Sequence, residues 1–140
     1  MKTVYLDSSA VLRWLLKDRN ALKDFGQWKH AGSSFLLEVE CIRTLDRLRM
    51  ENRIDAGLYA DLLAQLNEFS RSLELFHIDA RVINQAKSQF VAPVKTLDAI
   101  HIATAQLWQD ELSETVLLIS HDQKMNLIAK SLGLKTLESK

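Results

Sequence analysis

Four carboxylates in this sequence stand where apolar segments begin or end. Asp7 follows the run VYL, Asp122 comes shortly after TVLLIS, Asp98 opens the apolar stretch TLDAIHIATA, and Glu40 lies within SSFLLEVECIRTLDRLR. Acids that converge without matching bases repel one another, and a divalent cation held by oxygen ligands is the usual solution. A carboxylate set without Cys or paired His favours Mg²⁺ or Mn²⁺ over Zn²⁺. Such ions polarise a phosphodiester and activate water, so hydrolysis of nucleic acid is the predicted chemistry.

Each acid also has a purely structural explanation, which the sequence leaves open. Asp7 and Asp122 are suited to serve as N-caps that accept backbone N–H bonds from a following helix. Asp98 heads a helical stripe of otherwise apolar residues, so it needs a partner, and the helix dipole with its free N–H groups is one candidate. On the helix that carries Glu40, Glu38 is the alternative site residue, although it also fits an acid favoured by the helix N-terminus. We predict Glu40.

Short apolar runs alternate with helical patterns along the chain. Strands are expected at residues 4–6, 73–78 and 115–120, with a weaker strand at 34–36 and a possible edge strand after Gly133. Apolar runs of this length suit strands that are buried on both faces of a parallel sheet. The helical patterns cover residues 9–16, 38–50, 56–70, 79–90, 97–108 and 123–132.

This alternation predicts an α/β fold, a three-layer α/β/α sandwich with a mostly parallel central sheet. In open parallel sheets, ligands bind in the crevice beyond the carboxyl ends of the strands. Asp7 and Asp122 are expected at that edge because each follows a predicted strand. The four acids are therefore expected to meet in one pocket.

Size and composition restrict the class of protein. We expect a single domain over residues 1–140, since this length is typical of one domain. The 18 basic and 18 acidic side chains give zero formal net charge, so any nucleic-acid binding needs a local basic patch. The single Cys41 excludes an internal disulfide and a multi-thiolate zinc site. With no signal peptide and no long apolar run, we expect a cytoplasmic protein without a membrane partner.

Four motifs, YLDSSAVLRWLL, SSFLLEVECIRTLDRLR, TLDAIHIATA and LISHDQKMNLIAKSLGL, resemble the successive motifs of PIN-domain proteins, specifically VapC-like toxins of bacterial type II toxin–antitoxin pairs. They follow the family's order and span essentially the whole chain. The resemblance implies a PIN-like fold and an endoribonuclease that depends on one or two Mg²⁺ or Mn²⁺ ions. It also implies an RNA substrate, a homodimer, and a cognate antitoxin protein that covers the groove near the acids.

The resemblance assigns roles to individual residues. Asp7 and Asp98 match the family's principal metal-binding aspartates, Glu40 matches the acid of the second motif, and Asp122 matches the acid of the last. All four are therefore predicted to be catalytic and to bind metal. Ser9 matches a small hydroxyl residue that positions the first aspartate or a metal-bound water.

Several polar residues near the four acids are supporting candidates. Ser120 stands where the family often has Thr and retains the hydroxyl group. Arg43 and Arg47, one turn apart after Glu40, are candidate contacts for RNA phosphates, and the alternative is a solvated helix face that pairs with nearby acids. His101, three residues after Asp98, could approach the pocket as a proton carrier. A packed or hydrogen-bonded histidine is favoured, because metal-activated water needs no general acid.

Other functions fit the motifs less well. A haloacid-dehalogenase-type phosphatase would use Asp7 as a nucleophile and would need a second acid two residues later, where this chain has Ser9. A receiver-like phosphoacceptor needs adjacent acids that the segment LDSS lacks. The main alternative to the nuclease is a catalytically weak PIN-like module that binds RNA or a protein partner.

Overall fold

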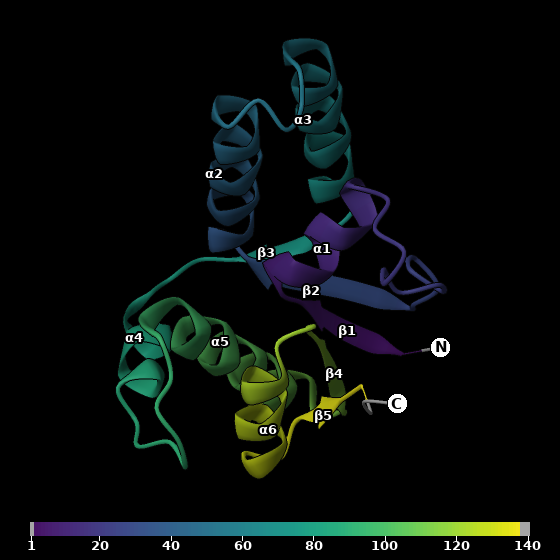
Figure 1. Cartoon of the computed structure of the whole chain (residues 1–140). Helices are drawn as coiled ribbons and strands as arrows, with labels where there is room; N and C mark the ends of the chain where they lie inside the picture. The colour runs from purple at the N-terminus through teal and green to yellow at the C-terminus, as the bar shows by residue number, and fades with distance from the viewer. Residues whose placement is uncertain (1, 138–140) are drawn as a thin grey trace.

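Parallel strands form the centre of the structure, a computed structural model that describes residues 2–137. In this part of the chain the sheet has five strands in the order β3-β2-β1-β4-β5, and every pairing is parallel (Figure 1). The central strands β1 and β4 are buried along their whole length, which explains their apolar sequences. The strands are β1 (Thr3–Leu6), β2 (His30–Ser34), β3 (Glu74–Phe76), β4 (Val116–Ile119) and β5 (Lys135–Thr136).

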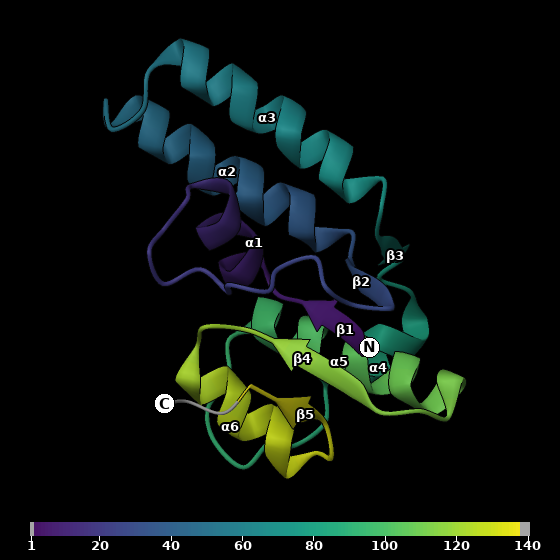
Figure 2. The same ribbon diagram turned by 90° about the vertical axis from the view of Figure 1, so that its right-hand side faces the viewer.

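Helices cover both faces of the sheet. They are α1 (Ser8–Leu15), α2 (Leu36–Met50), α3 (Ala56–Ser70), α4 (Ala80–Ala86), α5 (Thr96–Leu112) and α6 (Gln123–Ser131). Figure 2 shows α1, α2 and α3 on one side of the strands and α4, α5 and α6 on the other. Two buried apolar clusters lie between these layers and the sheet. The predicted α/β/α sandwich is therefore confirmed.

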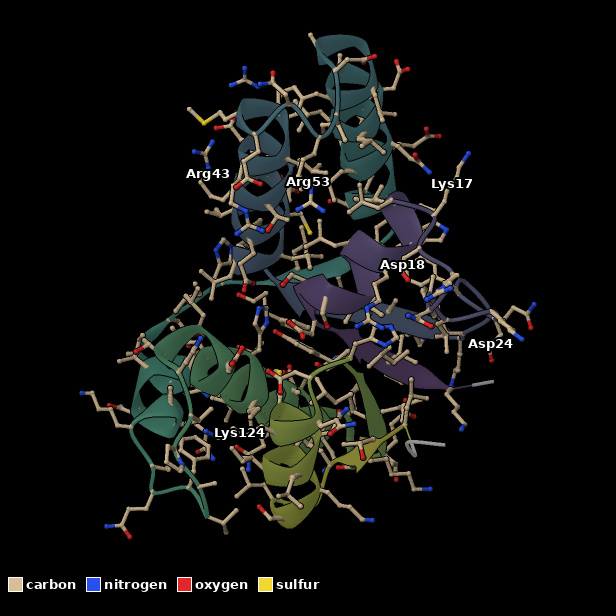
Figure 3. All side chains as sticks on the ribbon, viewed as in Figure 1. Lys17, Asp18, Asp24, Arg43, Arg53 and Lys124 are labelled. Atoms are coloured by element: carbon tan, nitrogen blue, oxygen red, sulfur yellow. The ribbon has the colours of Figure 1, made fainter. Side chains whose placement is uncertain are left out.

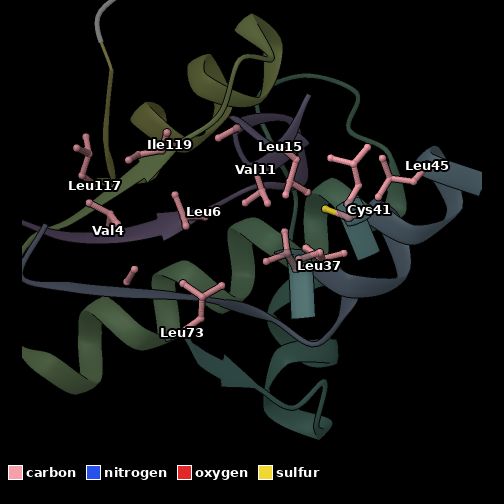
Figure 4. Close-up of a cluster of buried hydrophobic side chains, with 14 residues drawn as sticks. Val4, Leu6, Val11, Leu15, Leu37, Cys41, Leu45, Leu73, Leu117 and Ile119 are labelled. Carbon is pink, nitrogen blue, oxygen red and sulfur yellow. The ribbon is translucent and has the colours of Figure 1, made fainter. Parts of the chain in front are cut away.

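Side chains of β1 alternate between the two apolar clusters. Val4 and Leu6 pack with α1, α2 and α3, whereas Tyr5 packs with α5 and α6. Cys41 lies in the first cluster between Leu37 and Leu45 of α2 (Figure 4). Burial raises the pKa of the Cys41 thiol to about 12, so this group remains protonated and acts as a small apolar side chain.

Several predicted boundaries were wrong, and β2 differs most. It covers His30–Ser34, while Leu36, which we had placed in the weaker strand, begins α2. After His30, β2 consists of small residues, and the α5 side chain Trp108 packs directly against it. A Cβ atom at Gly32 would lie 2.9 Å from Trp108 Cη2. A strand of small residues under an indole ring lacks the apolar run by which strands are predicted from sequence.

The other differences are in length. The predicted strand at 73–78 is shorter, and the helix predicted at 79–90 ends at Ala86 because Phe90 and Val94 pack against the second cluster outside any helix. The helix predicted at 97–108 continues to Leu112 and ends where Ser113 takes a left-handed conformation. The possible edge strand after Gly133 is confirmed as β5. Within residues 2–137 no helix has the length and apolar character to span a membrane.

Candidate metal site

Asp7 lies at the carboxyl end of β1 and is almost completely buried, with 5% of its surface exposed. Its backbone occupies the N-cap position of α1, but its side chain makes no capping hydrogen bond. The carboxylate oxygen Oδ2 instead accepts hydrogen bonds from Ser120 Oγ at 2.7 Å and Ser9 Oγ at 2.9 Å. The N-cap explanation therefore does not hold for Asp7.

The two serine hydroxyls connect Asp7 to the loop between β4 and α6. Ser120 Oγ accepts the backbone N–H of Asp122 at 3.0 Å, and Ser9 Oγ accepts that of His121 at 3.0 Å. A hydroxyl has one proton, and in both serines it is donated to Asp7. Each serine is thus fixed by the loop on one side and orients the carboxylate on the other. The parallel pairing of β1 with β4 places these segments side by side.

Glu40 reaches the same edge of the sheet from the second turn of α2. His101 Nε2 lies 2.5 Å from Glu40 Oε1, and one ligand atom from each of Asp7, Glu40 and His101 lies within 4.8 Å of the other two. Between the two candidate acids of α2, it is Glu40 rather than Glu38 that lies in this group. His101 is completely buried, and its Nδ1 is 2.7 Å from Tyr5 Oη.

The pKa of His101 reports the negative charge around it. Burial acts to lower this pKa, but the hydrogen bond to Glu40 and the charges of Glu40, Asp7 and Asp98 outweigh burial. The pKa of His101 is therefore raised above its ordinary value.

Asp98 lies in the first turn of α5 and is half-buried. Its pKa is raised, first by burial and then by the negative charges of Asp7, Asp122 and Glu40. The salt bridges found within residues 2–137 use Asp46, Glu51 and Glu40, so no Lys or Arg in that range neutralises Asp98. The acids therefore repel one another in the protein without a cation.

Asp122 is an exposed N-cap of α6. Its Oδ1 accepts the backbone N–H groups of Lys124 at 3.0 Å and Met125 at 3.1 Å, so the structural explanation holds for this acid. Both capping bonds end on Oδ1, and a ligand role for Oδ2 is compatible with the cap. Asp98 and Asp122 line a cavity of about 240 Å³ together with Pro93, Val94, Lys95, Lys124, Met125 and Ile128.

The arginines of α2 extend into solvent beyond the acids. Arg43, labelled in Figure 3, has 67% of its side chain exposed and lies 3.3 Å from Asp46. Asp46 also binds Arg49 at 2.8 Å, and Arg47 is exposed. The solvated face that pairs with nearby acids is thus present, and contact with RNA stays a prediction for Arg43 and Arg47.

Comparison with known proteins identifies the family of this chain. The PIN domain family model matches residues 4–131. The chain belongs to the PIN domain family. It is 31% identical to "Ribonuclease VapC46" of Mycobacterium tuberculosis over 137 residues, which cover 96% of this chain and 95% of that protein.

Solved structures share the PIN fold at low sequence identity. A toxin–antitoxin complex from Klebsiella pneumoniae aligns with a TM-score of 0.63 and 16% identity, covering 88% of this chain and 89% of that one. VapBC-1 from nontypeable Haemophilus influenzae aligns with a TM-score of 0.61 and 14% identity, covering 97% of each chain.

Tyr5 was not predicted at this PIN-domain site, and His101 was considered near the pocket but was not predicted to be a site residue. The expectation of a hydrogen-bonded His101 is confirmed, but its partner Glu40 was not predicted. The signal for His101 was its spacing, because it comes one helical turn after Asp98 and therefore lies near the same face of α5. Tyr5 gave no such signal, because tyrosine is common in strands.

Proposed function

We propose that this PIN domain is an endoribonuclease that depends on Mg²⁺ or Mn²⁺ and acts as the toxin of a toxin–antitoxin pair. The observation that carries the proposal is the convergence of Asp7 and Glu40, with ligand atoms within 4.8 Å. Burial and the charges of these two acids raise the pKa of Asp98, and no Lys or Arg in the described residues neutralises these acids. Family membership and a relative named as a ribonuclease support the same activity.

The residues present fit a hard divalent cation. The short hydrogen bonds to Asp7 end on Oδ2, while among the described residues Oδ1 has only Ser8 Oγ at 3.5 Å, which leaves Oδ1 for a cation. Asp7, Glu40 and Asp98 would hold the ion or ions, with Asp122 contributing from the open side. When bound, such an ion polarises the phosphodiester and lowers the pKa of a water molecule.

The remaining residues have positioning and binding roles in this proposal. Ser9 and Ser120 keep the Asp7 carboxylate in one orientation, so that little reorganisation is needed during reaction. Arg43 and Arg47 attract RNA phosphates toward the acids and supply the local basic patch that zero net charge requires. The cavity beside Asp98 and Asp122 gives the RNA strand access to the cluster.

The test is single-turnover cleavage of a cellular RNA pool by purified protein with Mn²⁺ or Mg²⁺. Asp7→Asn and Asp98→Asn are each expected to slow cleavage by more than about 100-fold, because each removes a charged ligand at the reacting centre. Asp110→Asn is the matched control, since Asp110 is an exposed acid at the other end of α5. This variant should cleave RNA at the wild-type rate.

Two outcomes would contradict the nuclease. Fragments that persist in both aspartate variants would place the activity elsewhere. No fragments from folded wild-type protein that is loaded with metal and free of partners would favour the module that only binds RNA or protein.

A cognate antitoxin and a homodimer complete the proposal. The two solved structures described above come from toxin–antitoxin pairs, which supports the antitoxin partner. The chain purified alone is expected to have twice its 16.0 kDa mass in light scattering coupled to gel filtration. A monomer at micromolar concentration would contradict the homodimer without affecting the nuclease assay.

A further inference from the structure

Three side chains form a hydrogen-bonded path from the protein core to the acid cluster. Tyr5 Oη lies 2.7 Å from His101 Nδ1, and His101 Nε2 lies 2.5 Å from Glu40 Oε1. Tyr5 and His101 are fully buried, and 17% of the Glu40 side chain is exposed. The path therefore joins β1, which Asp7 directly follows, to α5 and α2, which carry Asp98 and Glu40.

An imidazole in this position needs an explanation. His101 is surrounded in α5 by buried apolar neighbours such as Ile102 and Ala105, and an apolar side chain would pack there without needing partners. Both ring nitrogens of His101 have partners, so the buried ring is fully satisfied. The polar path ends at the one member of the acid cluster on α2. This arrangement points to a role at Glu40 rather than in packing.

The hydrogen-bonding chemistry fixes which His101 atom faces Glu40. An ionised carboxylate only accepts hydrogen bonds, so Nε2 must carry the proton. The Tyr5 hydroxyl can donate to Nδ1 or accept from it, and it therefore holds the ring in place whether the imidazole is neutral or charged. The rings of Tyr5 and His101 also meet edge to face, with centroids 5.7 Å apart.

We propose that Tyr5 and His101 are positioning residues that hold the Glu40 carboxylate in the orientation required to bind a divalent cation. The proposal rests on the metal-dependent function above. The bond from His101 uses one Glu40 oxygen, which restricts rotation of the carboxylate and leaves the second oxygen for a cation. Removing a partner that orients a metal ligand typically lowers metal affinity or activity by about 10–100-fold.

Affinity for Mn²⁺, measured by electron paramagnetic resonance without RNA, tests this role. Tyr5→Phe keeps the ring and loses the hydroxyl, and we expect about 10-fold weaker binding. His101→Leu removes the donor to Glu40 and should weaken binding by about 10–100-fold. His101→Gln retains an N–H donor and should bind within about 3-fold of the wild type, because the orienting bond can re-form.

Thr3→Val is the matched control. Thr3 is a buried residue at the other end of β1, and its hydroxyl donates to Glu114 at 2.5 Å. This variant loses a hydrogen bond of the same strand without touching the acids, so it should melt at a lower temperature and bind Mn²⁺ as the wild type does. A merely structural role for Tyr5 would give the same result as Thr3→Val.

A second measurement tests the hydrogen bonds of His101 in the protein without metal. Nitrogen-15 NMR of the imidazole should show a protonated Nε2 in the wild type, with a proton that exchanges slowly with water. In Tyr5→Phe the same proton should exchange faster, because the ring has lost the partner that fixes it. Tyr5→Phe and His101→Gln carry the test if His101→Leu does not fold.

The outcomes separate this proposal from the proposed function. Wild-type Mn²⁺ affinity in Tyr5→Phe and His101→Leu would overturn the positioning role and leave the metal-dependent nuclease intact. A wild-type protein that binds no Mn²⁺ although its Nε2 proton is protected would overturn the metal-dependent function and, with it, this role.

Discussion

The two sides of the acid cluster are built differently. On one side Asp7 is buried and bound by two serine hydroxyls, and Glu40 is bound by the buried His101. On the other side Asp98 is half-buried, Asp122 is exposed, and both line a cavity. Hydrogen-bond donors from α1, α5 and the loop after β4 thus fix the first pair, whereas within the described residues the side chain of Asp122 bonds only to the helix that it caps.

This difference separates two requirements of the proposed reaction. A cation needs ligands whose orientation is set before it binds, and side chains locked by buried hydrogen bonds meet that need. An RNA strand needs access, which a half-open cavity provides. We infer that the Asp7 side sets the metal geometry and that the Asp98 and Asp122 side admits the substrate.

Among substitutions that leave all four carboxylates in place, the largest effect is expected on the buried side, from Ser120→Ala. This change removes the 2.7 Å bond to Asp7 and the acceptor for the backbone N–H of Asp122. Cleavage should slow by about 10–100-fold, because the Asp7 carboxylate loses an orienting partner. Stability should fall by about 1–2 kcal/mol, since a partly buried N–H loses its acceptor. Single-turnover cleavage and chemical denaturation measure the two effects.

Ser70→Ala is the control for Ser120→Ala. Ser70 is also buried, and its hydroxyl has no hydrogen-bond partner within the described residues. The Ser70→Ala variant should cleave RNA at the wild-type rate. If Ser120→Ala cleaves equally well, the orientation of Asp7 does not depend on the hydroxyl and the buried side is less specialised than we infer.

A smaller effect is expected on the open side, where two substitutions of Asp122 separate its cap from its charge. Asp122→Asn retains an oxygen for the bonds to Lys124 and Met125, so the melting temperature should stay the same while cleavage falls by less than about 10-fold. Asp122→Ala also loses the cap, and the free energy of unfolding should fall by about 1 kcal/mol. If Asp122→Asn slowed cleavage by about 100-fold, Asp122 would contribute as much to the reaction as the acids on the buried side.

The fold was predictable from sequence wherever burial creates a repeating pattern. The strands β1 and β4 lie in the middle of the sheet and are apolar throughout, and their ends located Asp7 and the loop before Asp122. β2 was misplaced because its residues are small enough to accommodate Trp108, a residue 76 positions away from Gly32 in the chain. Contacts of that kind leave no periodic pattern in the strand itself.

The four acids of the candidate site were predicted from sequence, whereas the hydrogen bonds that connect them to other residues were not. Motif order pointed to Asp7, Glu40, Asp98 and Asp122, and the structure groups the first two with His101. That Ser120 binds Asp7 and that Tyr5 reaches Glu40 through His101 depends on the pairing of β1 with β4 and on the packing of α5 against β1. These contacts join segments that are far apart in the chain. The spacing of residues within one segment therefore does not predict them.

The smallest expected effect is a gain of stability in Asp98→Asn without metal. Burial and the neighbouring acids raise the Asp98 pKa, so the folded protein binds the Asp98 proton more tightly than the unfolded chain does. Stability is then lost as pH rises from the ordinary Asp value through the raised folded pKa. Asparagine avoids this loss, and because Asp98 is half exposed the gain at pH 7 should be only about 0.5 kcal/mol.

Thermal melting at pH 7 and at pH 3 measures this gain. Asp98→Asn should melt about 1–3 °C above the wild type at pH 7 and show no gain at pH 3, where both proteins carry a neutral side chain. Added Mn²⁺ should reverse the order at pH 7, because only the wild type keeps the full ligand set. If the variant is instead less stable at pH 7 without metal, the N-terminus of α5 satisfies Asp98 by itself. Repulsion among the acids would then be too weak to account for a cation.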